Sequence, residues 1–292
     1  MRPVLAARRY KVHPVGMATF VHDGLRLWYE ESGSGAPVLF IAGTMSDHAT
    51  WDIIVPQLKG LRSITPDNRD IGNSDVARHD YSVRDMAGDV LALMGHLELE
   101  RASIVGHSLG GKIAQEVALL APARVDKLVL VCSSAQHDVQ SRSVMELWIS
   151  LREEVADDLV FAEVICLCAM GPDPLARVSL SDAAEMWLMK SGMQRGSAFI
   201  RNVEASLGSD TLARLGDIQA PTLVVYSDAD RIFSRKHGEQ LVAGIPGAQG
   251  ALMEGCGHAP MADRPAEFAR LLQQFLLPDL VSAERLPQQH AV

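Results

Sequence analysis

The stretch that decides the fold is residues 102–117, Ala-Ser-Ile-Val-Gly-His-Ser-Leu-Gly-Gly-Lys-Ile-Ala-Gln-Glu-Val. It starts with an apolar, β-branched run that stops at Gly106, and apolar residues at helical spacing follow from Ile113. This pattern predicts a buried strand that turns sharply into a helix. Ser108 lies on that turn, between Gly106 and Gly110, which let neighbouring backbone approach the serine closely.

The surroundings of Ser108 make it a candidate nucleophile. A Gly-x-Ser-x-Gly sequence between a strand and a helix is typical of a nucleophile elbow, which lifts the serine hydroxyl into the open. The helix behind it offers free N–H groups and the positive end of its dipole to an oxyanion formed at Ser108. This geometry suits acyl transfer, with the backbone N–H of Leu109 as one oxyanion donor.

With an acidic residue and a histidine later in the chain, the elbow gives the sequence a resemblance to the α/β-hydrolase family, over about residues 17–277. The resemblance implies an α/β fold with a mostly parallel eight-stranded sheet flanked by helices. It also implies a helical lid inserted after the sixth strand. The family's chemistry implies a Ser-His-acid triad and no metal or organic cofactor.

The resemblance assigns the other two triad members. His258 stands in Gly-Cys-Gly-His-Ala-Pro, which is similar to the family's histidine loop, and would act as the base. Asp230 occupies the acid position of the family's Gly-x-x-Asp pattern, with Ser227 in place of the glycine. Asp228 is the alternative acid. His107, beside the nucleophile, is expected to point away from it and to support a wall or the lid.

A turn after the apolar run 37–42 holds the second expected oxyanion donor. Family members commonly carry His-Gly here, whereas this chain has Ala42-Gly43-Thr44. The resemblance assigns the backbone N–H of Thr44 to the oxyanion hole, with that of Met45 as the competing donor. Because the donor is a main-chain group, replacing the histidine by Ala42 affects how the loop is anchored more than the chemistry.

Residues 67–74, Asp-Asn-Arg-Asp-Ile-Gly-Asn-Ser, look like the family's Asp-x-Arg-Gly-x-Gly-x-Ser turn, with Asp70 in place of the first glycine. Asp, Asn and Ser side chains close such turns on their own backbone. We therefore interpret this stretch as a hydrogen-bonded structural corner. No catalytic role is assigned to Asp67 or Arg69.

Other local signals place elements around the elbow. Asp23-Gly24 between two apolar alternations predicts a tight hairpin. Ser82, with Asp85 three residues later, predicts the capped start of a helix. Residues 51–59 are expected to form a short helix.

The regular alternation of strands and helices stops after Ser134, and residues 136–210 are typical of a mostly helical lid. Their large, adaptable apolar side chains suit the roof of a greasy pocket. Met145, Trp148 and Trp187 from this segment, with Met45 from the core, are candidate pocket residues. The expected organisation is an N-terminal arm at 1–16, a core at 17–135 and 211–277, the lid at 136–210 and a C-terminal tail at 278–292.

Composition narrows the class of protein. The 292 residues are 48% hydrophobic and 22% charged, which suits one α/β core with an insertion. A formal net charge of −9 disfavours nucleic acid and anionic membranes as partners. Four scattered cysteines lack metal-ligand spacing, so we expect reduced thiols. With neither a secretory signal nor an apolar run of ~20 residues, a cytoplasmic monomer or homodimer acting on a small-molecule substrate is expected.

The nucleophile type favours a reaction class. Family members similar to haloalkane dehalogenases and epoxide hydrolases use aspartate at the elbow, so Ser108 favours carboxylic esters, lactones or thioesters. The corner at 67–74 and the Trp51-Asp52 helix start look like carboxylesterases and enol-lactonases, including 3-oxoadipate enol-lactonase-like and aclacinomycin methylesterase-like enzymes. We expect a serine esterase or lactonase with a hydrophobic substrate. The alternatives are a carbon–carbon bond hydrolase or cofactor-free perhydrolase with the same triad and, outside enzymes, a ligand receptor on this scaffold.

Overall fold

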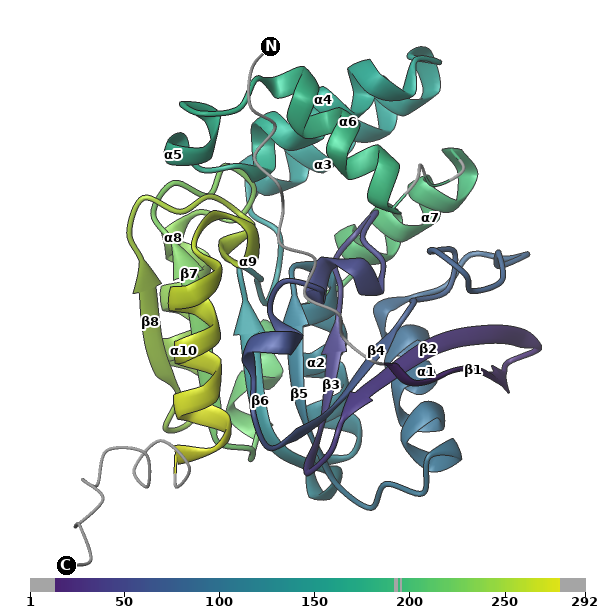
Figure 1. The fold of residues 1–292 in the computed structure, drawn as a ribbon, viewed down its shortest axis with the longest axis vertical. Helices are drawn as coiled ribbons and strands as arrows, with labels where there is room; N and C mark the ends of the chain where they lie inside the picture. The colour runs from purple at the N-terminus through teal and green to yellow at the C-terminus, as the bar shows by residue number, and fades with distance from the viewer. Residues whose placement is uncertain (1–13, 192–193, 195, 279–292) are drawn as a thin grey trace, which may run out of the picture.

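The computed structural model describes residues 14–191, 194 and 196–278 (Figure 1). Residues 1–13 of the expected N-terminal arm and 279–292 of the expected tail lie outside this range. The strands are β1 (Pro14–His22), β2 (Leu25–Gly33), β3 (Ala36–Ile41), β4 (Leu61–Pro66), β5 (Ala102–His107), β6 (Val125–Val131), β7 (Thr222–Ser227) and β8 (Gln249–Met253).

The strands form one eight-stranded sheet in the order β1-β2-β4-β3-β5-β6-β7-β8. The β1–β2 and β2–β4 pairs are antiparallel, and the pairs from β4–β3 to β7–β8 are parallel. Since parallel neighbours need crossover connections, helices cover both faces of the sheet. The expected fold class is confirmed.

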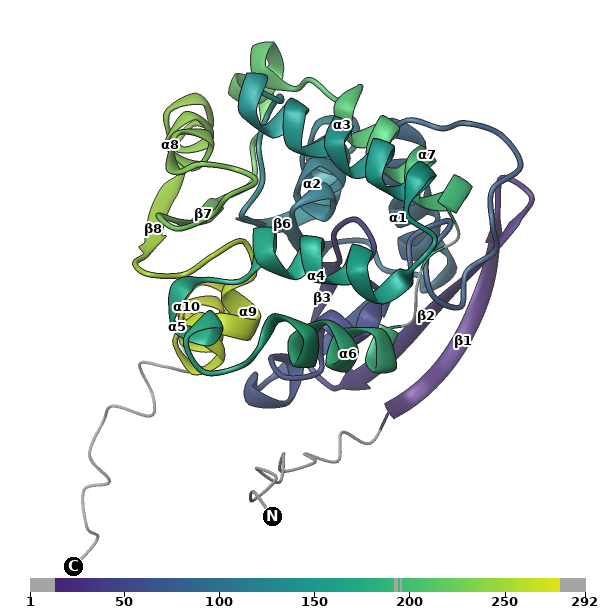
Figure 2. The same cartoon turned by 90° about the horizontal axis from the view of Figure 1, so that it is seen from above.

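The helices fall into a core set and a lid set. The core helices are α1 (Val83–His96), α2 (Leu109–Leu120), α8 (Arg235–Gly244), α9 (Pro260–Asp263) and α10 (Pro265–Leu276). Between β6 and β7 the described residues form α3 (Val139–Glu154), α4 (Asp158–Ala169), α5 (Pro172–Leu175), α6 (Leu180–Ser191) and α7 (Gly196–Leu207), which we call the lid. The lid lies over the end of the sheet where the parallel strands finish (Figures 1 and 2).

Alternate side chains of the central strands enter two separate cores. On β3, Leu39 and Ile41 pack with residues of α1, α2 and α8, while Val38 and Phe40 pack with residues of α10. Figure 2 shows α1, α2 and α8 on one side of the sheet and α10 on the other. Burial on both faces explains why these strands are continuously apolar in sequence.

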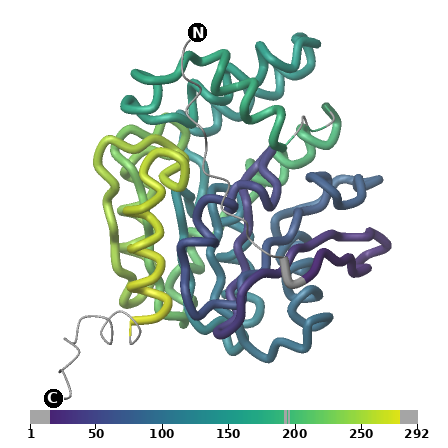
Figure 3. The backbone as a smooth tube through the Cα atoms, in the orientation of Figure 1, coloured from purple at the N-terminus to yellow at the C-terminus, as the bar shows by residue number. Residues whose placement is uncertain are grey.

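Figure 3 follows the chain from the β1–β2 hairpin at one edge of the sheet to the yellow helix α10 near the opposite edge. The hairpin turns at Asp23 and Gly24, whose φ angles of 52° and 72° match the predicted tight turn. The predicted start of α1 is also confirmed, because Ser82 and Asp85 form a reciprocal capping box. Within the described ranges, every helix is too short or too polar to cross a bilayer.

The short helix expected at 51–59 is wrong. Two 3₁₀ turns, His48–Trp51 and Val55–Gln57, occupy this region instead. Pro56 accounts for the difference, because proline lacks the N–H that a continuous helix needs and its ring collides with the preceding turn. Pro56 itself lies inside the second turn, and the break between the two turns falls at residues 52–54.

Candidate active site

Ser108 lies at the sharp turn between β5 and α2. Its backbone has φ 55° and ψ −118°, in the left-handed half of conformational space that residues with a side chain rarely adopt. The neighbouring strand end holds this conformation, because Ser108 N–H donates to the Val131 carbonyl at 2.9 Å and the Ser133 hydroxyl donates to the Ser108 carbonyl at 2.8 Å. The turn that the sequence predicts is thus fixed from both sides.

The two elbow glycines are required by close backbone contacts. A Cβ atom on Gly106 would collide with the backbone of Gly110, and a Cβ on Gly110 would collide with the carbonyl of Ile41. Any larger residue would push the strand and helix apart. The Gly-x-Ser-x-Gly pattern therefore has a steric cause in this chain.

Asp230 and His258 meet across the carboxyl ends of β7 and β8. The Asp230 Oδ2 atom lies 2.8 Å from His258 Nδ1, and both side chains are buried. The second carboxylate oxygen accepts the backbone N–H groups of Ile232 and Phe233 at 2.8 and 2.9 Å. The alternative acid, Asp228, is exposed and accepts a backbone N–H of the neighbouring loop. The structure therefore brings Asp230, and not Asp228, to the histidine.

Ser108 and His258 line the same cavity, whose volume is about 360 Å³. Small-molecule sites in proteins commonly occupy clefts of ~300–1,000 Å³. The cavity lies between the lid and the carboxyl ends of the strands, which is where open α/β sheets place their ligands.

The expected oxyanion donors lie on two sides of Ser108. A Cβ on Gly43 would stand 3.0 Å from the Ser108 Cβ, so the turn that contains Gly43 packs against the serine. Thr44 and Met45 follow in that turn and both line the cavity. Leu109 is the first residue of α2, where a backbone N–H has no acceptor within its own helix.

All four candidate pocket residues, Met45, Met145, Trp148 and Trp187, line the cavity. Further lining residues of α6 have no chemical signal that marks them singly in the sequence. Three of them, Ala183, Lys190 and Ser191, follow from Trp187 by helical spacing, since one helix face carries residues three and four positions apart, whereas Met186 directly precedes Trp187.

Two of these α6 residues tie the lid to the loop after β3. The Lys190 ammonium donates to the Ala49 carbonyl at 2.6 Å, and the Ser191 hydroxyl donates to Asp47 Oδ1 at 3.1 Å. Lys190 also lies 3.3 Å from a carboxylate oxygen of Asp52. Lys190 and Ser191 therefore both line the cavity and hold the lid against the core.

His107 supports the histidine loop. It lines the cavity wall, as expected, but its Nε2–H donates to the backbone carbonyl of His258 at 2.8 Å instead of to the lid. Complete burial lowers the pKa of His107 to about 3, so the ring is neutral near pH 7. A neutral ring that donates from Nε2 is a fixed support for the main chain of His258.

The Cys132 thiol lies beside the buried acid and histidine. Among the described residues, Cys132, Asp230 and His258 form the one cluster whose candidate ligand atoms all lie within 4.8 Å of one another. Burial, reinforced by the nearby Asp230 charge, raises the pKa of the Cys132 thiol well above its usual range. The Cys132 Sγ atom lies 3.6 Å from the Ser227 hydroxyl oxygen, so the thiol packs between the end of β7 and the acid–histidine pair.

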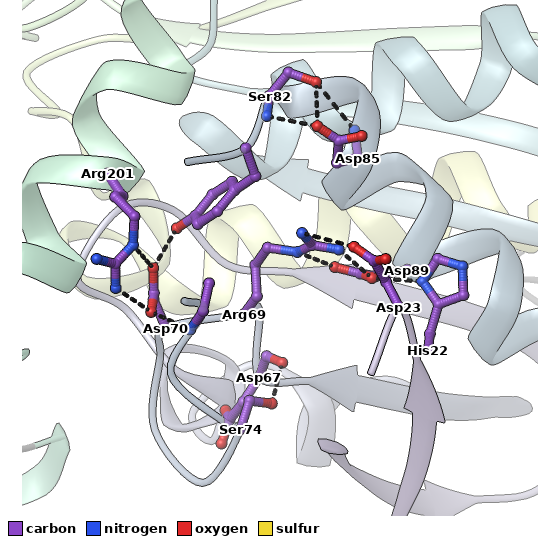
Figure 4. A network of polar contacts seen from close by, with 12 residues as sticks. His22, Asp23, Asp67, Arg69, Asp70, Ser74, Ser82, Asp85, Asp89 and Arg201 are labelled. Carbon is purple, nitrogen blue, oxygen red and sulfur yellow. Dashed lines mark hydrogen bonds and ion pairs between the residues drawn. The ribbon is translucent and has the colours of Figure 1, made fainter. Parts of the chain in front are cut away.

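The stretch 67–74 forms a hydrogen-bonded corner, as predicted (Figure 4). The Arg69 guanidinium donates two hydrogen bonds to the carboxylate of Asp89, at 2.7 and 2.8 Å. Asn68 donates its side-chain N–H to the Ala42 carbonyl at 3.1 Å. This bond anchors Ala42, the residue before the turn that holds the expected oxyanion donor.

Asp70 gives this corner a contact with the lid. Its φ of 71° is the left-handed conformation that the family's glycine adopts easily. Arg201 of α7 donates two hydrogen bonds to the Asp70 carboxylate at 2.9 and 2.8 Å, and the Tyr81 hydroxyl donates a third at 2.9 Å (Figure 4). A glycine at this position would leave the lid arginine without its partner.

A doubly covered parallel sheet with a serine elbow, an acid–histidine pair and a lidded cavity defines a hydrolase class of α/β protein. The sequence pattern of the alpha/beta hydrolase family matches residues 38–271. The chain belongs to the α/β-hydrolase family.

Several relatives and solved structures carry hydrolase names. The chain is 30% identical to the putative carbamate hydrolase RutD of Agrobacterium fabrum, covering 82% of this chain and 93% of the relative. It is 27% identical to the pimeloyl-[acyl-carrier protein] methyl ester esterase of Photobacterium profundum, covering 86% and 98%. The crystal structure of a hydrolase from Pseudomonas aeruginosa PA01 matches with a TM-score of 0.82 and 26% identity, covering 90% and 98%. These similarities support hydrolase function for this chain.

Proposed function

We propose that this chain is a serine hydrolase that cleaves a carboxylic ester or lactone of a hydrophobic small molecule. The observation that carries the proposal is the buried Asp230–His258 pair, joined at 2.8 Å, which shares a cavity wall with Ser108 at the elbow. A nucleophile, a base and a group that orients the base are the parts that covalent acyl transfer requires.

In the proposed acylation, the Ser108 hydroxyl attacks the substrate carbonyl while His258 accepts its proton. Asp230 holds the imidazole with Nδ1–H toward the carboxylate and stabilises the imidazolium that forms. The tetrahedral intermediate then collapses, the acyl–oxygen bond breaks, and His258 returns the proton to the departing alcohol. The acyl group remains on Ser108.

In the proposed deacylation, water attacks the acyl-serine with His258 again as base, which releases the carboxylic acid and restores Ser108. Backbone N–H groups of Leu109 and Thr44 stabilise the oxyanion in both steps, with Met45 as the alternative to Thr44. Loss of one such donor in other hydrolases costs roughly 2.7–4 kcal/mol of transition-state stabilisation. The proposed steps use protein groups and water alone.

The cavity supports a hydrophobic substrate. Its lid wall includes Met145, Trp148 and Trp187, and Ile165 and Ile232 add further apolar lining. Such a surface binds acyl chains or rings by removing their apolar area from water. Relatives named as an ester esterase and a carbamate hydrolase both cleave an acyl carbon from a heteroatom, in agreement with the proposed bond.

The test is steady-state hydrolysis of p-nitrophenyl acetate and butyrate by the full chain. We expect multiple turnovers, and a loss of at least about 10³-fold in kcat for Ser108→Ala, because the attacking oxygen is removed. Asp228→Asn serves as the matched acid control and should retain turnover, whereas Asp230→Asn should lose most of it.

Other outcomes point to the alternatives. One slow turnover with tight product retention would favour a receptor. Cleavage of a carbon–carbon bond in a diketone without ester turnover would favour the carbon–carbon bond hydrolase. Peroxide-dependent formation of a peracid without ester turnover would favour the perhydrolase. Undiminished ester turnover in Ser108→Ala would contradict the proposal.

A further inference from the structure

Two loops carry the proposed acid and base: the acid loop, residues 228–234 after β7, and the histidine loop, residues 254–259 after β8. The carboxyl end of α4, in the lid, contacts both loops. The last carbonyl groups of any helix lack partners within the helix and must find them elsewhere. Here they find them in the two loops.

At the end of α4, the lid contributes backbone carbonyl groups, which accept hydrogen bonds from the two loops. The His258 N–H donates to the Ala169 carbonyl at 2.8 Å. Arg231, in the acid loop, donates from Nη1 to the carbonyls of Leu167 and Met170, each at 2.8 Å. Because the His258 carbonyl is held by His107 on the elbow strand, the main chain of His258 is fixed between the lid and the elbow.

Asp263 strengthens the same junction. Its Oδ2 atom accepts the N–H of Gly257 at 2.7 Å and the N–H of Gly171 at 3.0 Å, so one carboxylate oxygen joins the histidine loop to the second residue after α4. Burial raises the pKa of Asp263 above its ordinary value, although both N–H donors act in the opposite direction. Burying this carboxylate costs free energy, and its hydrogen bonds to the lid and to the histidine loop offset that cost.

The backbones of Gly171 and Gly257 approach too closely for a side chain. A Cβ on Gly171 would lie 2.6 Å from Asp263 Oδ2 and 2.8 Å from Gly257 N, although its φ of −73° would suit alanine. A methyl group at position 171 would thus act by displacing the junction and not by straining its own backbone. This makes Gly171 a clean site at which to disturb the contact.

We propose that the carboxyl end of α4 positions His258, with Gly171 and Asp263 as positioning residues, so that the lid is part of the catalytic apparatus and not only a roof. This inference rests on the proposed function. A shift of the base by about 1 Å costs on the order of 10²-fold in rate. Disturbing the junction should therefore lower kcat even for an ester too small to use the lid wall.

The decisive comparison is Gly171→Ala against Gly196→Ala with p-nitrophenyl acetate. Gly196 is also a lid glycine, but a Cβ there meets only Arg152 Nε, at 3.9 Å. We expect kcat of Gly171→Ala to fall by about tenfold or more, with a parallel fall in the rate of Ser108 labelling by a fluorophosphonate. Gly196→Ala should match the unmodified chain in both. Equal kcat for the two variants, or a loss confined to KM for long acyl esters, would overturn the proposal.

Two variants of Asp263 keep the proposal testable if Gly171→Ala fails to fold. Asp263→Asn retains an oxygen that can accept both N–H groups, whereas Asp263→Ala removes it. We expect kcat per titrated active site to be lower in the alanine variant than in the asparagine variant. A purely structural role would lower the melting temperature of Asp263→Ala but leave kcat per titrated site and the pH–rate profile unchanged.

Ser108→Ala separates the two failures. If Ser108→Ala keeps ester turnover, the proposed function itself fails. If Ser108→Ala is inactive while Gly171→Ala and Asp263→Ala match the unmodified chain per active site, only the positioning role of α4 is wrong.

Discussion

At the scale of single residues, Asp70 carries a left-handed backbone that glycine would adopt more easily. The strain of such a conformation is on the order of 1 kcal/mol. Its carboxylate offsets this by accepting two hydrogen bonds from Arg201 and one from Tyr81, and its side chain has no exposed surface. The departure from the family's glycine is therefore explained by a contact between the core and the lid.

We predict that Asp70→Gly destabilises the chain by about 3 kcal/mol, because relief of strain does not compensate for an unpartnered, largely buried Arg201. Urea unfolding of the two proteins measures the difference. Glu239→Gln, which breaks the exposed Arg235–Glu239 pair, is the control and should leave stability unchanged. A variant as stable as the unmodified chain would show that the Arg201 contact contributes nothing.

His137 should make stability depend on pH. Burial, with the nearby Lys112 and Arg142 charges, lowers its pKa to about 3, so the folded ring stays neutral while the unfolded ring protonates near 6.5. Its stabilising contribution is complete above pH 6.5 and is lost as pH falls toward 3. Between pH 8 and pH 5 the free energy of unfolding should fall in both proteins. We expect the fall to be smaller in His137→Gln than in the unmodified chain by about 2 kcal/mol, measured by urea unfolding. If the free energy of unfolding changes with pH in the same way for both proteins, the pKa of His137 is not lowered on folding.

At the scale of elements, one face of α6 shapes the cavity and the opposite face meets solvent. Trp187 lines the cavity, whereas Met189, two positions on, is 79% exposed. Trp187→Ala removes a bulky side chain from the wall and enlarges the cavity, so kcat/KM for p-nitrophenyl octanoate relative to acetate should rise by about tenfold. Met189→Ala is the matched control and should leave this ratio unchanged. If the octanoate-to-acetate ratio of kcat/KM is the same in both variants, the acyl chain does not bind against Trp187.

Elements with local causes could be predicted from the sequence. The β1–β2 turn depends on Asp23-Gly24, and the start of α1 depends on Ser82 with Asp85, so each signal and its effect lie within a few residues. The helix expected at 51–59 is wrong because Pro56 stands inside that stretch and a continuous helix cannot accommodate it. The elbow was predictable because its Gly-x-Ser-x-Gly signal is also only a few residues long, although its glycines act by allowing close backbone approach and the left-handed residue is Ser108.

At the scale of the whole molecule, the site depends on contacts that no local pattern encodes. The resemblance to a family pairs Asp230 with His258, but the supporting bond from His107 joins residues 151 positions apart. The Gly171–Asp263 contact spans 92 positions and depends on where α4 ends above the sheet. Such contacts follow from packing between elements, so the sequence predicted the elbow and the order of its partners but not the lid junction.

The central claim is that Ser108 forms an acyl-enzyme with His258 as base and Asp230 as its orienting acid. The most direct measurement is intact-mass and peptide analysis of the full chain after rapid acid quench from p-nitrophenyl butyrate. The account predicts a butyryl group on the peptide that contains Ser108, absent in Ser108→Ala and formed more slowly in His258→Ala. Ester turnover with no adduct on Ser108, or with the adduct on another residue, would contradict it.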